Sequence, residues 1–62
     1  MQITLAAARV NKGLTQAEAA KALNVSITTL KSWEKGERYP KQPQIDKLCA
    51  VYGISYDNLF FN

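Results

Sequence analysis

Two helix signals joined by a tight turn, in residues 14–36, constrain this chain more than any other feature of its sequence. Thr15 is suited to cap the first helix, and Glu18, three residues later, completes a capping box. The alanine-rich run that follows has a high helix propensity. It ends at Asn24, a residue that tolerates the left-handed conformation in which many helices stop. Val25, the apolar residue of the turn, is expected to fill the gap between the two helices.

The second helix is expected over 27–35, because Ser26 is a good N-cap and Gly36 provides a good C-terminal exit. Leu30 and Trp33, three residues apart, form its apolar stripe. The other side chains on or near the outer face are Ile27, Thr28, Thr29, Lys31, Ser32 and Lys35. A short helix that presents hydroxyls, a lysine and one aliphatic outward suits the floor of a DNA major groove.

Three further helices are expected in the rest of the chain. Thr4 caps one over 5–11, and Pro43 is well placed in the first turn of another. Ser55 is expected to cap a short fifth helix over 56–60. The inward positions of these three helices are Leu5, Ala8, Ile45, Leu48, Cys49, Tyr52 and Leu59. Because the sequence contains no strand signal and no repeat, the predicted fold class is all-α.

A resemblance to the helix-turn-helix of phage repressor and Cro-like regulators, the XRE group, is carried by LTQAEAAKALNVSITTLKSWEKG, by Arg9 upstream and by IDKLCAVYGISYDNL downstream. It covers nearly the whole chain. It implies a single DNA-binding domain over 1–62, folded as a compact five-helix bundle of the phage-repressor type. It also implies an ion pair, because Arg9 and Glu34 stand where the family pairs these residue types at the end of the recognition helix. That pair has a folding role.

The resemblance also implies which residues meet DNA. Those at positions that contact base edges or the adjacent backbone are Ser26, Ile27, Thr28, Lys31 and Ser32. Thr28 and Ile27 suit thymine methyl groups, Thr28 can also bond a base, and Lys31 can donate to guanine. Those expected at phosphates are Thr15, Gln16, Lys35, Arg38, Tyr39 and Lys41, the first two at a helix N-terminus that carries partial positive charge. The direction of Thr29, toward the next helix or toward phosphate, stays open.

Charge is distributed unevenly along the chain. The formal net charge is +3, and all eight basic residues precede position 48, after which Asp57 is the only charged side chain. One end of the molecule can therefore face phosphate while the other is nearly uncharged. Tyr56, Phe60 and Phe61 belong to that uncharged end. They either cap the core or form a self-complementary patch for a homodimer, at least on DNA, as in the repressors that this chain resembles.

These observations favour a sequence-specific transcriptional regulator of double-stranded DNA, a repressor or Cro-like protein, with a palindromic operator as partner. Two alternatives stay open: an antitoxin that binds both DNA and a toxin, and a protein-interaction module on the same fold. An enzyme is not expected, because histidine, a metal-binding set and a phosphate-cradling glycine loop are all missing from the sequence. No cofactor, metal or small-molecule substrate is expected either.

The single cysteine, Cys49, excludes an intrachain disulfide and suits a reducing cytoplasm. The sequence shows neither a membrane-spanning run nor the layout of a signal peptide. We therefore expect a cytoplasmic location at the nucleoid, and the resemblance implies a prokaryotic or phage origin.

Overall fold

Hydroxyl caps set the start of three helices in this chain. The computed structural model describes residues 2–61, and within them four α-helices follow one another: α1 (Leu5–Asn11), α2 (Gln16–Leu23), α3 (Ile27–Lys35) and α4 (Gln42–Tyr52). The side-chain oxygens of Thr4, Thr15 and Ser26 accept hydrogen bonds from backbone N–H groups in the first turns of α1, α2 and α3. The predicted bounds of α3 are confirmed at both ends, and the capping box of α2 is present.

The turn between α2 and α3 depends on one residue in the left-handed conformation. Asn24 caps the end of α2 with φ 59° and ψ 43°, and it is the single non-glycine residue with positive φ among residues 2–61. Gly36 ends α3 in the same region, with φ 80°. Val25 is half-buried and packs against the core, as expected from its place between the helices.

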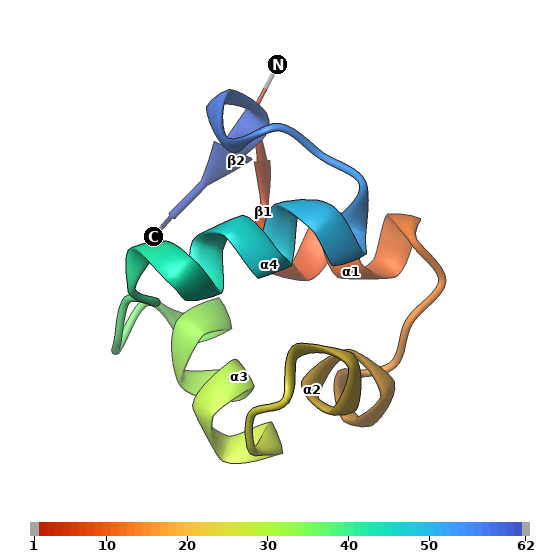
Figure 1. Cartoon of the computed structure of the whole chain (residues 1–62), viewed down its shortest axis with the longest axis vertical. Helices are drawn as coiled ribbons and strands as arrows, with labels where there is room; N and C mark the ends of the chain where they lie inside the picture. The colour runs from red at the N-terminus through yellow and green to blue at the C-terminus, as the bar shows by residue number, and fades with distance from the viewer. Residues whose placement is uncertain (1, 62) are drawn as a thin grey trace.

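The four helices enclose one hydrophobic cluster. Its buried members are Leu5, Ala8, Ala19, Ala20, Leu23, Leu30, Trp33, Leu48, Tyr52 and Leu59. Helix α2 packs against both α3 and α4, and α4 crosses the middle of the molecule above them (Figure 1). Leu30 on α3 and Leu48 on α4 are completely buried, so the inner face of α3 packs against the centre of the core.

The predicted fifth helix is wrong. Its residues form a 3₁₀ turn, η1 (Tyr56–Asn58), followed by strand β2 (Leu59–Phe60), which pairs in parallel with β1 (Ile3–Thr4). Ser55 makes no capping hydrogen bond, and five residues are too few to sustain a helix without one. Extended backbone instead lets Leu59 lie opposite Ile3 and enter the core. The expectation that the chain has no strand is therefore wrong as well.

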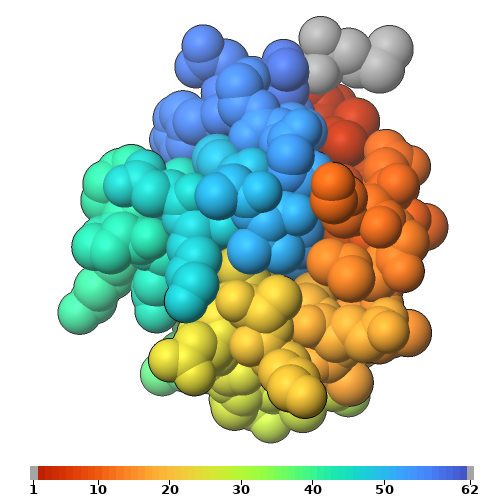
Figure 2. Space-filling view, turned by 45° about the vertical axis from the view of Figure 1, so that its right-hand side comes forward, coloured from red at the N-terminus to blue at the C-terminus, as the bar shows by residue number. Residues whose placement is uncertain are grey.

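The paired strands bring the two ends of the described chain together. Figure 2 shows the N-terminal residues beside the last described residues, at the end of the molecule opposite the turn between α2 and α3. The molecule thus has two contrasting ends. One carries the front of α3 and the start of α2, and the other carries the strand pair.

Candidate nucleic-acid interface

Helix α3 is half buried and half exposed along its length. Leu30 is completely buried and Trp33 is 5% exposed, whereas Ile27 is 40% exposed and Thr28 and Lys31 are also exposed. Among residues 2–61, the side chains of Thr28 and Lys31 have no hydrogen-bond or ion-pair partner. The packed stripe therefore fixes the helix, while the opposite face keeps donors, acceptors and methyl groups free for a ligand.

The hydroxyl groups of Ser26 and Thr29, at the start of α3, are hydrogen-bonded to each other. Ser26 Oγ accepts from the Thr29 backbone N–H at 3.1 Å and donates to Thr29 Oγ1 at 2.9 Å. Thr29 is half-buried, so its side chain lies over the first turn and beside the pocket described below. Ser26 is thus committed to the cap. Ser32, another predicted base contact, is half-buried.

The N-terminus of α2 is closed by reciprocal hydrogen bonds. Thr15 Oγ1 accepts from the Glu18 N–H at 3.1 Å, and Glu18 Oε1 accepts from the Thr15 N–H at 2.9 Å. The bond from the Thr15 backbone lowers the pKa of the Glu18 carboxyl, because it favours the charged form. The capping bond leaves the hydroxyl proton of Thr15 available, and this side chain is exposed.

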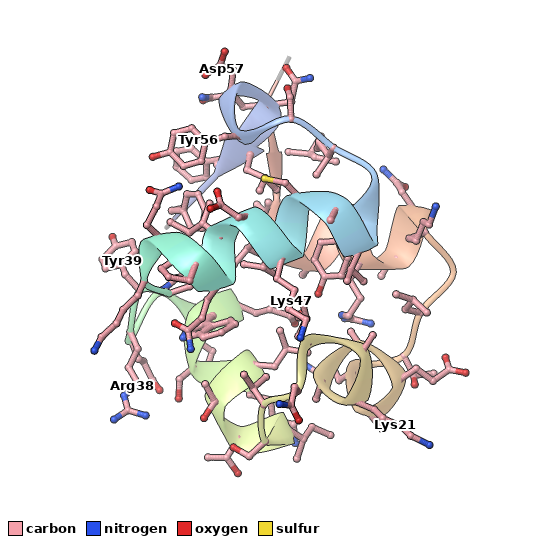
Figure 3. The ribbon with its side chains drawn as sticks, in the orientation of Figure 1. Lys21, Arg38, Tyr39, Lys47, Tyr56 and Asp57 are labelled. Carbon is pink, nitrogen blue, oxygen red and sulfur yellow. The ribbon has the colours of Figure 1, made fainter. Side chains whose placement is uncertain are left out.

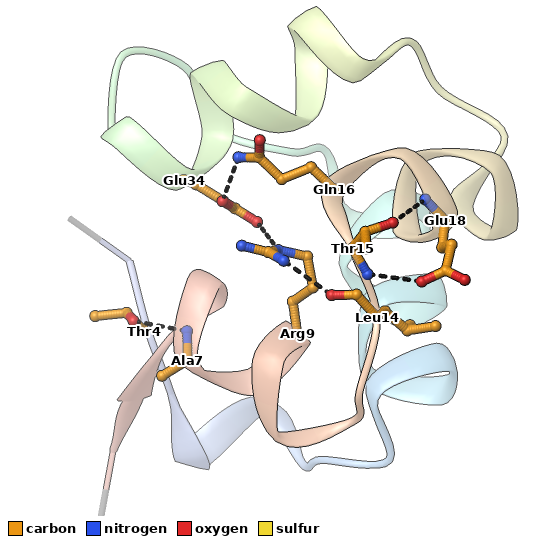
Figure 4. A network of polar contacts seen from close by, with 8 residues as sticks. All are labelled: Thr4, Ala7, Arg9, Leu14, Thr15, Gln16, Glu18 and Glu34. Atoms are coloured by element: carbon orange, nitrogen blue, oxygen red, sulfur yellow. Dashed lines mark hydrogen bonds and ion pairs between the residues drawn. The ribbon is translucent and has the colours of Figure 1, made fainter.

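Glu34 connects three parts of the chain through its two carboxylate oxygens (Figure 4). Arg9 Nε donates to Glu34 Oε2 at 2.8 Å, and Gln16 Nε2 donates to Glu34 Oε1 at 3.0 Å. Arg9 also donates to the Leu14 carbonyl at 2.8 Å. The side chains of Arg9 and Glu34 are only 14% and 7% exposed, so this ion pair is largely shielded from water. It holds the end of α3 against α1 and the start of α2.

Gln16 has a partner that the sequence did not suggest. A carboxylate has only acceptors, so the amide nitrogen of Gln16 must face Glu34. One N–H of that amide is therefore used inside the protein, and the second stays free. Gln16 itself is half-buried.

The last residue of α3 and the loop after it carry the remaining predicted phosphate contacts. Lys35, Arg38, Tyr39 and Lys41 are all exposed. Arg38 and Tyr39 project from the loop that leads into α4 (Figure 3). A pocket of about 280 Å³ lies beside it, lined by Thr29, Trp33, Arg38, Tyr39, Lys41 and Gln44. The loop therefore places two cations on the same side of the molecule as α3.

Tyr39 also belongs to an aromatic row that reaches the C-terminal strand. Its ring centroid lies 6.4 Å from that of Phe61, which in turn lies 6.0 Å from that of Tyr56. Tyr56 and Phe60 are exposed, and Phe61 is half-buried against the core. Sequence reasoning missed this row because no spacing rule connects a loop residue with the chain end. The aromatic surface therefore extends further than the three predicted residues.

A buried hydroxyl lies close to the ion pair. Tyr52 is 5% exposed, and its hydroxyl has no hydrogen-bond partner among the described residues. Burial, reinforced by the negative charge of Glu34, raises the pKa of Tyr52 to about 12. Burial also raises the pKa of the Cys49 thiol, with Asp46 adding to the effect. Both residues are therefore neutral at physiological pH.

Comparison with known protein families identifies the same helix-turn-helix that the structure shows in α2 and α3. The family model for helix-turn-helix proteins matches residues 5–59, and the chain belongs to this DNA-binding family. It is 33% identical over 51 residues to the HTH-type transcriptional activator BcrR of Enterococcus faecalis, covering 82% of this chain and 25% of that protein. It is 37% identical over 46 residues to the cryptic phage CTXphi transcriptional repressor RstR of Vibrio cholerae, covering 74% of this chain and 41% of that protein. No solved structure matches.

The chain thus spans about a quarter of the length of one of these curated relatives and about two fifths of the other. Within residues 2–61, no helix is both long enough and apolar enough to cross a bilayer. The same residues contain no cluster of three or more histidine, cysteine or carboxylate side chains suited to a metal ion.

Proposed function

We propose that this protein is a sequence-specific regulator of transcription that binds double-stranded DNA and reads the major groove with the outer face of α3. The observation that carries the proposal is the division of α3 into a buried stripe and an exposed face that lacks internal partners. A scaffold that fixes a helix by Leu30 and Trp33 can hold its front at a defined depth in the groove. Thr28 and Lys31 are then available for base edges.

Phosphate contacts would flank this helix on both sides. At the start of α2, the hydroxyl proton of Thr15 and the second amide N–H of Gln16 are available for one backbone segment. Across α3, the exposed side chains of Lys35, Arg38 and Lys41 are available for the other, and Tyr39 is exposed beside them. Contacts of this kind position a protein on the duplex without reading its sequence. They therefore predict strong salt dependence of binding.

We further propose that two copies bind an inverted repeat and that the bound dimer represses transcription by occupying a promoter. A single module of this size buries too little area for tight specific binding. Tyr39, Tyr56 and Phe60 are exposed, and Phe61 links Tyr39 to Tyr56 through ring contacts, which suits contact with a second copy. Similarity to a phage repressor supports the repressor role.

Selection of bound duplexes from a random DNA pool tests the proposal. We expect enrichment of inverted half-sites about ten base pairs apart. Lys31→Ala or Thr28→Ala should each weaken binding to the selected duplex by about 1–3 kcal/mol. Lys21→Ala is the matched control, because it removes the same charge from the exposed side of α2 and should have a smaller effect that vanishes at high salt.

Failure to enrich any sequence would exclude sequence-specific reading. Binding that weakens equally for Lys31→Ala and Lys21→Ala would exclude α3 as the reading helix. Affinity that does not change with salt would argue instead for a protein-interaction module. Circular dichroism of each variant establishes that the helices remain folded.

A further inference from the structure

The pocket between α3 and the start of α4 offers mainly hydrogen-bond donors to a ligand. Thr29 Oγ1 already accepts from Ser26 Oγ at 2.9 Å, so the hydroxyl proton of Thr29 remains to be donated. Gln44 Oε1 accepts from the Lys41 backbone N–H at 2.8 Å, so the NH₂ group of this amide remains. Trp33 can only donate, and its indole N–H has no hydrogen-bond partner among residues 2–61. The polar groups left over in the pocket therefore suit a ligand that accepts hydrogen bonds.

The charge around the pocket narrows the ligand to an anion. Arg38 and Lys41 are exposed and line the pocket, and none of its six lining residues is acidic. Arg38 projects from the loop that leads into α4 (Figure 3). A guanidinium can hold a carboxylate through two parallel hydrogen bonds, and an ammonium adds a point charge. The pocket therefore matches an acceptor that carries a negative charge.

Two aromatic rings and the volume of the pocket limit the rest of the ligand. Trp33 is fixed in the core at 5% exposure, and the ring of Tyr39 contacts that of Phe61, with 6.4 Å between the centroids. Both lining rings offer apolar surface against which a further ring can pack. A cavity of about 150 Å³ accommodates benzene, whereas drug-sized ligands occupy about 300–1,000 Å³. A pocket of about 280 Å³ therefore suits a single ring that carries one small anionic group.

We propose that this pocket binds a small aromatic carboxylate and that the bound ligand releases the protein from DNA. The carboxylate lies between Arg38 and Lys41, and its ring packs against Trp33 and Tyr39. The release rests on the proposed function, in which Arg38 and Lys41 also contact the DNA backbone. Cations that are neutralised by a ligand carboxylate attract phosphate less strongly, so the ligand and DNA each lower the affinity of the protein for the other.

Benzoate is the probe, and Trp33 is the reporter because it is the single tryptophan of the chain. In proton–nitrogen NMR spectra of the full chain at constant ionic strength, benzoate should shift the indole N–H resonance saturably, with half-saturation at about 1 mM. Benzamide keeps the ring without the charge, and acetate keeps the charge without the ring. Each should bind at least about tenfold more weakly. A shift that does not saturate, or that is equal for the three compounds, would overturn the proposal, as would tighter binding of inorganic phosphate.

Protein variants locate benzoate in the pocket. Lys41→Ala and Lys47→Ala each remove an exposed lysine, but Lys41 lines the pocket, whereas Lys47 lies on α4 apart from Arg38 and Tyr39 (Figure 3). Only Lys41→Ala should weaken benzoate binding, by about tenfold. Gln44→Glu keeps an acceptor for the Lys41 N–H, so the start of α4 stays intact, but it adds a negative charge that should abolish binding. Equal weakening in the two lysine variants, or unchanged affinity in Gln44→Glu, would contradict this site.

The release from DNA is measured separately with the duplex selected from the random pool. At ten times the concentration that half-saturates the pocket, benzoate should weaken DNA binding about tenfold, whereas acetate at the same concentration should not. If benzoate binds but DNA affinity is unchanged, the release is wrong while the proposed function stands. If no duplex is selected, the proposed function fails, and the NMR titration still decides whether the pocket binds an aromatic carboxylate.

Discussion

The pair α2–α3 and the C-terminal segment 55–61 acquire their structures in different ways. In the pair, each helix start has a side-chain cap within three residues, and each helix end has a residue in the left-handed region. In the C-terminal segment, Ser55 makes no cap bond, and Leu59 is held by pairing with Ile3 at the other end of the chain. The comparison teaches that the helix-turn-helix pair is specified by local signals, whereas the C-terminal segment depends on tertiary contacts.

Breaking the ion pair between Arg9 and Glu34 should lower the stability of the fold more than any of the following substitutions. This pair is a tertiary contact that holds the end of α3 against α1. Arg9→Ala or Glu34→Ala should each lower the free energy of unfolding by about 3–5 kcal/mol, since the remaining charge is left shielded from water without its partner. Urea denaturation followed by circular dichroism measures this. The double variant Arg9→Met/Glu34→Leu should recover much of the loss. A loss below about 1 kcal/mol in the single variants would mean that the pair behaves as an exposed salt bridge.

Shortening the anchor of the C-terminal segment should have the next largest effect. Leu59 is 3% exposed, so Leu59→Ala should cost about 2–5 kcal/mol through lost burial and the cavity left behind. Phe60→Ala is the control, since Phe60 is exposed next to it in β2. Thermal unfolding of both variants gives the comparison. Equal losses in the two would contradict the inward orientation of Leu59.

Two cap substitutions compare a helix start that has a side-chain cap with the start of the C-terminal segment, which has none. Thr15→Ala removes an observed capping box and should cost about 1 kcal/mol, within the usual range for N-caps. Ser55→Ala removes a hydroxyl that makes no cap bond and should change stability by less than about 0.5 kcal/mol. The same urea titration measures both. A larger loss of stability in Ser55→Ala than in Thr15→Ala would contradict the conclusion that the helix-turn-helix, and not the C-terminal segment, depends on local caps.

The smallest effect at neutral pH is expected at Tyr52, where α4 meets the ion pair. Tyr52→Phe removes a buried hydroxyl without a partner, so stability at pH 7 should be unchanged or slightly higher. Unfolded tyrosine loses its proton near pH 10, whereas burial raises the pKa of Tyr52 to about 12 in the folded protein. The folded state therefore binds the proton more tightly than the unfolded state. Wild type should lose stability relative to Tyr52→Phe as pH rises from 10 to about 12.

Unfolding curves of the wild type and Tyr52→Phe across that pH range test whether the wild type loses stability relative to the variant. A wild type that gained stability relative to the variant above pH 10 would require a partner that stabilises the tyrosinate. Arg9 is the nearby cation that lowers the pKa of this group, but its effect is smaller than that of burial. The difference between the two curves isolates Tyr52 from the other groups that titrate there.

The sequence predicts much of the helix-turn-helix because its signals are local. The caps at Thr15 and Ser26, the left-handed Asn24 and the inward Leu30 and Trp33 all follow from short spacings. The exposed face of α3 follows from the same period of 3.6 residues. What could not be predicted is the pairing of two-residue strands, since neither strand is long enough to show an alternating pattern.

The same reasoning applies to individual side chains of the candidate site. The outward direction of Thr28 and Lys31 could be read from helical spacing. The bond from Gln16 to Glu34 and the ring contact between Tyr39 and Phe61 could not, because each joins residues that lie far apart in the chain. Phosphate or base contacts inferred for these residues stay predictions until DNA binding is measured.

The strand pair also has a consequence for synthesis. Because β1 precedes the four helices in the chain and β2 follows them, Ile3 cannot pair with Leu59 during synthesis until α1 to α4 have left the ribosome. The helices can form early because their caps are local, but the core lacks the buried side chain of Leu59 until β2 has emerged. During that interval the apolar surface that Leu59 later covers is exposed to solvent, and the domain gains its full stability only after β2 has emerged.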